Sequence, residues 1–113
     1  MSDDFYCENV LSGKIDVEIV RETENVLGYH HTRPFWEMHI VVIPKRHISS
    51  LLTLEEADDG LFLELFEVIR EIAADIVAER GAARVLTNLG EYQDSKHLHF
   101  HVYSGERTVQ SVK

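Results

Sequence analysis

The sequence predicts an α+β fold, in which a mostly antiparallel sheet packs against one long helix. Two patterns predict this class: apolar residues at helical spacing between Phe62 and Val77, and β-branched runs on both sides of that segment. The connections between these elements are short. A length of 113 residues suits one domain, so we expect residues 1–113 to form a single unit.

The long helix has the clearest start and stop signals. Thr53-Leu54-Glu55-Glu56 has the pattern of a capping box that opens the helix, and Gly81 is a natural stop. A stripe as wide as this one indicates either a deeply buried helix or a helix that also packs against a partner subunit. Its apolar residues are Leu61, Phe62, Leu63, Leu65, Phe66, Val68, Ile69, Ile72, Ala73, Ile76 and Val77.

Five strands and one short helical turn are expected around the helix. The run from Met38 to Ile43 is the richest in β-branched residues, and Pro44 ends it. The helical turn is predicted over residues 8–13. The predicted strands cover residues 16–21, 26–31, 38–43, 84–88 and 97–103.

Charge and composition exclude several classes of function. The formal net charge is −9, which disfavours binding to a polymeric nucleic acid because phosphate neutralisation needs clustered cations. A small anionic substrate is still compatible, since local donors can hold a phosphate. No apolar run approaches the length of a membrane span, so no membrane partner is expected. Cys7 is the only cysteine, which favours a reducing compartment and a cytoplasmic protein.

Residues 97–103 read HLHFHVY, so three of the seven histidines occupy every second position of one predicted strand. Side chains of a strand alternate between its two faces. Leu98, Phe100 and Val102 are therefore expected to face the core, and the histidines to share the other face. Two chemical interpretations are open: metal ligation by imidazole, and nucleophilic or acid–base chemistry at a phosphorus centre.

The motif HLHFHVY at residues 97–103 resembles the signature of the histidine triad family. The segment HIVVIPKRHI at residues 39–48 is similar to the central strand and turn of that family. The order of the other elements agrees as well: a long helix, a strand that ends at Asn88, and a loop that contains glycine. The resemblance covers roughly residues 5–105.

The resemblance implies hydrolysis or transfer of nucleotides through a covalent nucleotidyl-histidine intermediate. His99 matches the nucleophile that attacks the α-phosphate. His101 matches the residue that contacts the phosphate and assists the leaving group, and His97 matches the one that supports the orientation of the nucleophile. His39, on the neighbouring strand, matches a further histidine that faces the triad.

The resemblance also implies four substrate-binding residues: Asn88, Gln93, Ser95 and His31. Residues 90–95 form a shorter and more acidic loop than the glycine-rich phosphate loop of the family. His31 stands where the family commonly has an acidic residue that holds the ribose hydroxyls. An imidazole cannot accept two hydroxyl protons at once as a carboxylate does, so nucleoside binding is expected to be weaker or differently arranged.

Further expectations concern the base and the C-terminus. Tyr29, Phe35 and Trp36 are candidates for the base pocket, and equally for the core or a lid. After Gly105 the sequence lacks the Trp-Pro-Pro-type tail of Hint-type members of the family, so specificity carried by that tail is not expected.

A metal ion is not expected. Some bacterial members of the family hold a structural zinc near the N-terminus with a Cys-x-x-Cys pair and two histidines. Here Cys7 has no second cysteine, and one thiolate makes a poorer tetrahedral site even with His47 and His97 beside it. No other cofactor is implied.

The leading interpretation is a homodimeric hydrolase or transferase that cleaves the α-phosphate of purine nucleoside phosphoramidates or related AMP-X substrates. The resemblance implies a five-stranded sheet in each subunit, with two sheets joined into one continuous ten-stranded sheet and the long helices at the interface. A dinucleoside polyphosphate (Ap4A-type) hydrolase is the nearest alternative. A metal-dependent protein that uses the same histidines, and a non-catalytic nucleotide-binding protein, also remain open.

Overall fold

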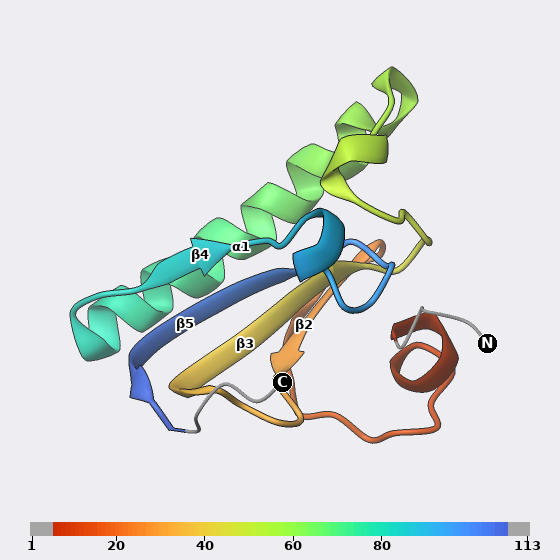
Figure 1. Ribbon diagram of the computed structural model, residues 1–113. Coiled ribbons are helices and arrows are strands. Elements are labelled where there is room, and N and C mark those ends of the chain that lie inside the picture. Colours follow the sequence, from red (N-terminus) through yellow and green to blue (C-terminus); the bar gives the residue numbers. More distant parts are fainter. Residues whose placement is uncertain (1–5, 109–113) are drawn as a thin grey trace.

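A computed structural model describes residues 6–108 of the chain. It has an antiparallel five-stranded sheet of order β1-β2-β3-β5-β4 with one main helix, α1, which confirms the predicted α+β class (Figure 1). In chain order the elements are η1 (Tyr6–Val10), β1 (Ile19–Glu22), β2 (Val26–His30), β3 (Trp36–Pro44), η2 (Leu51–Thr53), η3 (Glu56–Asp58), α1 (Asp59–Arg80), β4 (Arg84–Leu86), η4 (Gly90–Tyr92) and β5 (Phe100–Arg107).

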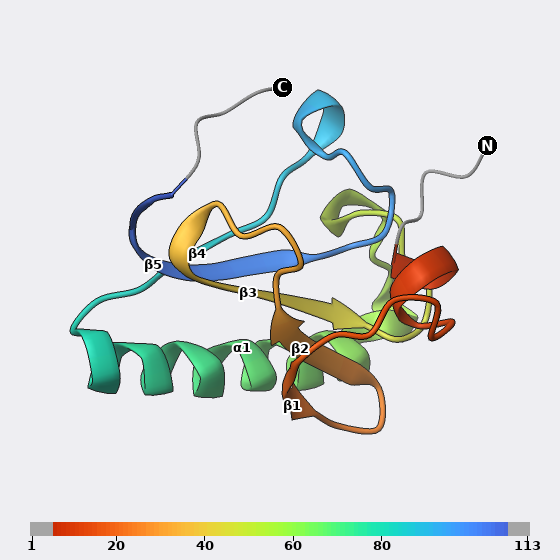
Figure 2. The ribbon, with the colours of Figure 1, turned by 90° about the horizontal axis from the view of Figure 1, so that it is seen from below.

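The two faces of the sheet are covered by different elements. The helix α1 lies along one face, and the N-terminal turn η1 lies on the opposite side (Figure 2). The core on the α1 side takes Val26, Ile40, Val42, Ile48, Leu98, Phe100 and Val102 from the sheet and its loops, and Leu65, Val68, Ile69, Ile72 and Ile76 from the helix. The core under η1 consists of Tyr6, Val10, Leu27, Tyr29, Val41 and Ile43.

The helix α1 begins at Asp59, so the prediction that Thr53 caps it is wrong. Ser50 caps a separate 3-10 turn, in which the Thr53 hydroxyl accepts a hydrogen bond from the Ser50 amide at 3.1 Å. A second 3-10 turn follows, where the Glu55 amide donates to the Asp58 carboxylate at 2.9 Å. Local side-chain bonds therefore stabilise two tight turns before the helix can start.

Glycine controls the end of α1 and its approach to the sheet. Gly81 adopts the left-handed conformation with φ 93°, and its N–H donates to the Val77 carbonyl at 2.8 Å, which confirms the predicted stop. Gly28 of β2 lies beneath the helix, because a Cβ atom there would stand 2.8 Å from Cδ1 of Ile72. The missing side chain lets α1 pack closely against β2.

The strand β5 starts at Phe100, later than predicted. The Leu98 amide donates to the Ile48 carbonyl at 2.6 Å, and the His99 carbonyl accepts from the Thr87 hydroxyl at 2.7 Å. The first residues of the HLHFHVY motif are therefore bonded to neighbouring loops, and the hydrogen bonds of the sheet begin only at Phe100. The alternation itself is confirmed, because the apolar side chains of the motif belong to the core under α1.

The other predicted boundaries differ from the observed ones by a few residues. Within the described residues, 6–108, no helix is both long and apolar enough to cross a membrane. The predicted ranges 16–21, 26–31, 38–43, 84–88 and 8–13 correspond to β1, β2, β3, β4 and η1.

Candidate active site

The predicted catalytic histidines gather on the face of the sheet that is turned away from α1. His97, His99 and His101 are 0%, 5% and 8% exposed, and His39 of β3 is 2% exposed. Buried imidazoles need hydrogen-bond partners for both ring nitrogens. The partners of each ring therefore fix which nitrogen carries the proton.

His99 has the tautomer that a nucleophile needs. Its Nδ1 lies 2.7 Å from the carbonyl oxygen of His97. A carbonyl can only accept, so Nδ1 carries the proton, and in the neutral ring Nε2 carries the lone pair. The backbone carbonyl of His97 thus orients the His99 ring, a role that the resemblance gave to His97 without specifying the atom.

The ring of His97 is held by a similar bond. Its Nε2 donates to the carbonyl of Pro44 at 2.8 Å, which leaves the lone pair on Nδ1. This Nδ1 lies 3.4 Å from Sγ of Cys7. The ring of His97 therefore connects the end of β3 to the N-terminal turn.

His39 and His101 are linked by hydrogen bonds in which Nδ1 of each ring is the acceptor, whereas Nδ1 of His99 is a donor. The Phe35 amide donates to Nδ1 of His39 at 3.0 Å, so the His39 proton is on Nε2. That Nε2–H donates to Nδ1 of His101 at 2.8 Å. The neutral His101 ring consequently keeps its own proton on Nε2, where it is a hydrogen-bond donor.

His31 joins this second pair. Its ring stacks on His39 with 4.3 Å between ring centroids and lies 5.9 Å from the ring of His101. The Arg33 amide donates to Nδ1 of His31 at 2.9 Å, so the proton of His31 is also on Nε2. The structure thus places His31, a predicted substrate-binding residue, beside His39 and His101.

The protonation of these three rings is strongly disfavoured. Burial lowers the pKa of His39 to about 3, and the nearby His31 ring adds to the effect. Burial, together with the charges that His99, His39 and His31 would carry, lowers the pKa of His101 to about 3. Burial and the neighbouring His99 lower the pKa of His31 to about 4. All three rings are therefore neutral donors near pH 7.

Two residues that the sequence analysis did not single out as site residues hold His99 in place. The ring of Tyr6, from η1, packs against the ring of His99 with 4.9 Å between centroids. The Thr87 hydroxyl, directly after β4, donates to the His99 carbonyl at 2.7 Å. Nothing in the local sequence marks these contacts, because both arise from residues that are distant along the chain.

The predicted substrate-binding residues lie in loops beside the histidines. Gln93 is buried, and its amide nitrogen donates to the carbonyls of Ser49 and Ser95 at 2.6 and 2.9 Å. These bonds stabilise the loop, so a substrate contact by Gln93, which stays a prediction, would use Oε1. Asn88 and Ser95 are half-buried. Their contacts with a substrate also stay predictions.

The aromatic candidates for the base pocket separate into different roles. Tyr29 is 1% exposed and belongs to the core under η1. Trp36 stacks on Tyr103 with 3.8 Å between ring centroids. Phe35 is 39% exposed, and its ring lies 5.6 Å from that of His31. Phe35 is therefore the aromatic residue that offers open surface beside the histidines.

One group of side chains has the donor atoms that zinc prefers. Sγ of Cys7 and ring nitrogens of His47 and His97 all lie within 4.8 Å of one another. The lone pair of His97 is on Nδ1, the atom next to Cys7, so the tautomer suits ligation. A zinc ion held by these three residues would cross-link η1 to the histidine segment. The expectation that the chain carries no metal ion stays a prediction.

The fold is α+β, and its site holds His99, with the lone pair on Nε2, beside the Nε2–H donors His101 and His31. Residues 12–108 match the HIT domain, so the chain belongs to the HIT, or histidine triad, family. An uncharacterised 13.2 kDa HIT-like protein of Azospirillum brasilense is 35% identical over 101 residues, which cover 87% of this chain and 83% of that protein.

Solved structures agree with this assignment. A histidine triad protein from Clostridium difficile is 28% identical with a TM-score of 0.78, and the match covers 99% of this chain and 98% of that one. A HIT family hydrolase from Legionella pneumophila Philadelphia 1 has a TM-score of 0.79 at 23% identity, with 94% and 96% of the two chains covered. The latter likeness shows the fold.

Proposed function

We propose that the chain is a hydrolase that cleaves the α-phosphate of purine nucleoside phosphoramidates or related AMP-X substrates through a nucleotidyl-His99 intermediate. The observation that carries the proposal is the tautomer of His99. Its Nδ1–H is bound to the His97 carbonyl, so the lone pair is on Nε2, and the His101 ring lies 5.1 Å away between centroids with its proton on Nε2. A nucleophile and a donor thus lie side by side.

The first chemical step forms a bond between His99 Nε2 and the α-phosphorus. The bond from phosphorus to the leaving nitrogen breaks, and the departing amine takes a proton from water. The Nε2–H of His101 donates to the phosphoryl oxygens, where negative charge develops, and the His39 Nε2–H keeps His101 in the required tautomer. Burial lowers the pKa of His101 to about 3 before a substrate binds, so the ring meets the phosphate as a neutral hydrogen-bond donor.

The second step releases the nucleotide. Water attacks the phosphorus of the nucleotidyl-His99 intermediate, the bond from phosphorus to Nε2 breaks, and a proton returns to solvent. His99 regains its lone pair, while the His97 carbonyl still holds Nδ1–H. The same two steps would cleave a dinucleoside polyphosphate, with a nucleotide as the leaving group.

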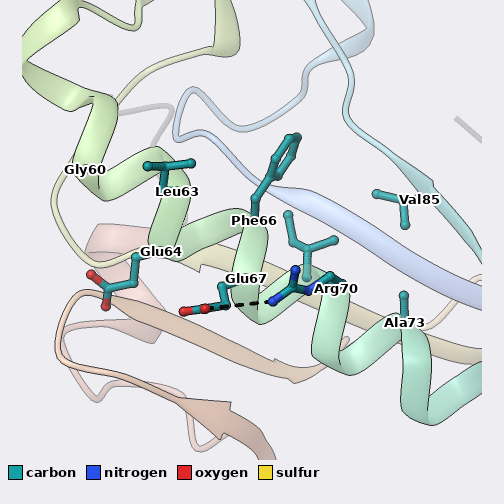
Figure 3. A pocket seen from close by; sticks show the side chains of 9 residues that line it. Gly60, Leu63, Glu64, Phe66, Glu67, Arg70, Ala73 and Val85 are labelled. Atoms are coloured by element: carbon teal, nitrogen blue, oxygen red, sulfur yellow. Dashed lines mark ion pairs between the residues drawn. The ribbon is translucent and has the colours of Figure 1, made fainter.

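The proposal includes a homodimer that forms across β4 and α1. Leu63, Phe66 and Val85 are 70%, 48% and 46% exposed, although all are apolar. They line one groove with Ala73 between the helix and β4, as Figure 3 shows. Because β4 is an edge strand, a second copy could pair there and extend the sheet. Phe66→Asp is expected to shift the mass measured by light scattering from dimer to monomer.

The proposal treats residues 1–113 as one domain in the cytoplasm. The HIT match covers 12–108 of these residues, and Cys7, which forms no disulfide bond within the chain, suits a reducing compartment.

Hydrolysis of an adenosine phosphoramidate tests the proposed activity. Wild type, His99→Ala and the control His30→Ala are compared, each with and without EDTA. His30 is a half-buried histidine of β2, 4.0 Å from Glu18, and it has no role in the proposed reaction. We expect turnover by wild type and His30→Ala that survives EDTA, and a loss of at least about a thousandfold in His99→Ala.

Other outcomes point elsewhere. Turnover that EDTA abolishes would contradict the proposed mechanism and support a metal-dependent one. Binding of AMP without turnover of phosphoramidates or dinucleoside polyphosphates would leave a nucleotide-binding protein.

A further inference from the structure

His31, His39 and His101 bring ring nitrogens within 4.8 Å of one another, an arrangement that first suggests a metal site. The hydrogen bonds argue for the opposite use. A histidine binds a metal through a lone pair, and the neutral ring has only one nitrogen without a proton. In His31 and His39 that nitrogen is Nδ1, and it accepts the amides of Arg33 and Phe35 at 2.9 and 3.0 Å.

The cluster therefore presents protons and not lone pairs. A metal ion at Nε2 of either ring would move the proton to Nδ1 and break the bond from the backbone amide. Each lost bond would leave a backbone donor without its acceptor, which opposes the change. The ligands that fit the cluster are acceptor oxygens.

His31 lies at the open side of the cluster. It is half-buried, whereas His39 and His101 are almost fully buried. The Nε2–H of His39 is already bound to His101, so it does not reach a ligand. Phe35, 39% exposed, adjoins His31 with 5.6 Å between ring centroids and offers a surface on which a base can stack. A sugar linked to that base and to the phosphate at His99 would lie against His31.

We propose that His31 is a specificity-determining residue that donates a hydrogen bond from Nε2 to the 2′ or 3′ oxygen on the sugar of the bound nucleotide. This inference rests on the proposed function in that it takes a nucleotide as the ligand. His31 has one donor and an occupied acceptor, so it can receive a lone pair from the sugar but cannot accept a hydroxyl proton. The chain consequently does not require a free sugar hydroxyl: an ether oxygen serves as well.

Binding of methyl ethers of AMP tests the proposal without turnover. The His99→Ala protein is titrated by calorimetry with AMP, 2′-O-methyl-AMP, 3′-O-methyl-AMP and 2′,3′-dideoxy-AMP. With His31 present, we expect both ethers to bind within about threefold of AMP, since they keep the acceptor oxygen. The dideoxy compound, which lacks it, should bind about fivefold more weakly.

Aspartate and asparagine have nearly the same size, so replacing His31 by each of them separates the effect of hydrogen-bond direction from that of side-chain shape. His31→Asp places a carboxylate at the sugar, and we expect at least one ether to become about tenfold weaker than AMP, because an ether cannot donate. In His31→Asn the side-chain oxygen can take over the Arg33 amide and the NH₂ group can donate to the sugar. The ratio of the ether to AMP affinities should then stay within about threefold, as with His31. The ratio of ether affinity to AMP affinity does not change if a substitution weakens the binding of all ligands by the same factor.

Several outcomes would overturn the inference. Tenfold discrimination against an ether in the His31 protein, or identical ratios in the Asp and Asn variants, would show that His31 does not set the polarity at the sugar. Failure to bind AMP would overturn it together with the proposed function. Zinc binding that His31→Ala abolishes would show a metal site instead. Normal ratios in a protein without phosphoramidase activity would support the role of His31 and refute only the proposed reaction.

Discussion

The histidines of the site form two groups that use the same ring in opposite ways. In the lone-pair group, His97 and His99, each ring donates one N–H to a backbone carbonyl and keeps a lone pair on the other nitrogen. In the donor group, His31, His39 and His101, each Nδ1 accepts a hydrogen bond and the proton stays on Nε2. The hydrogen-bond partner of each ring, which is a backbone group except in His101, decides which nitrogen carries the lone pair.

The division assigns the chemistry. The lone-pair group can attack phosphorus or bind a metal, and the donor group can stabilise negative charge. Both groups lie on the same face of one sheet, with 5.1 Å between the ring centroids of His99 and His101. Substitutions that change one group without the other test whether this division exists.

Apart from removal of His99 itself, the largest effect should follow from a break in the donor chain at His39. In His39→Leu, His101 loses the donor that fixes its tautomer, and we expect kcat for phosphoramidate hydrolysis to fall roughly a hundredfold. His39→Gln can still offer an N–H near the same place and should retain more activity. Steady-state kinetics compares the two variants with His30→Ala as the control. Equal losses in Leu and Gln would contradict the role given to the His39 proton.

The donor group also makes stability depend on pH. The pKa of His39 and of His101 is lowered to about 3 in the folded chain, and a histidine of an unfolded chain titrates near pH 6.5. Between these values the unfolded chain binds more protons, so the free energy of unfolding falls as the pH falls below about 6.5. The slope should reach at most about 1.4 kcal/mol per pH unit for each histidine.

Urea denaturation between about pH 7.5 and pH 5 measures this slope above the range in which carboxyl groups titrate. His39→Gln should show a smaller slope than wild type, because one of the titrating rings is gone. If the free energy of unfolding stays constant or rises on acidification, these rings are protonated as readily in the folded chain as in the unfolded chain.

A smaller effect is expected on the lone-pair side at Thr87, a positioning residue. Thr87→Val keeps the shape but removes the hydroxyl that donates to the His99 carbonyl at 2.7 Å. We expect kcat to fall about fivefold with little change in KM, since the loss acts on the placement of the nucleophile. Thr87→Ser should restore kcat. A change confined to KM would assign Thr87 to substrate binding.

The smallest effect on activity should come from a substitution of Cys7. This substitution tests whether zinc binds to the lone-pair group and not to the donor group. The chain is expected to carry no resident metal ion, but Zn²⁺ added in excess should bind weakly at Cys7, His47 and His97, where His97 offers a lone pair, and protect the thiol from a thiol reagent. Cys7→Ser should lose this binding and keep kcat within about threefold of wild type. Zinc binding that persists in Cys7→Ser but disappears in His39→Gln would invert the assignment.

Much of this arrangement followed from the sequence. The alternation in HLHFHVY predicted which side chains face the core, and the structure confirms it even though β5 begins only at Phe100. Alternation depends on the local backbone, so it can be read from neighbouring residues. The expectation that His39 faces the triad rested on the family resemblance, whereas His31 was expected only at the sugar of a nucleotide.

The tautomers could not be predicted, because they depend on contacts between distant segments. The bond from His97 to the Pro44 carbonyl and the bond from Thr87 to His99 join residues that no periodic pattern relates. The wrong helix start has a similar cause: Ser50 competes with Thr53 for the capping role, and both have suitable side chains.

The most direct test of the division is the tautomer of each ring. Long-range ¹H–¹⁵N correlation spectra of the labelled protein at neutral pH, assigned with single histidine variants, report which nitrogen carries the proton. We expect a proton on Nδ1 of His99 and on Nε2 of His31, His39, His97 and His101. A proton on Nε2 of His99, or on Nδ1 of His39, would contradict it.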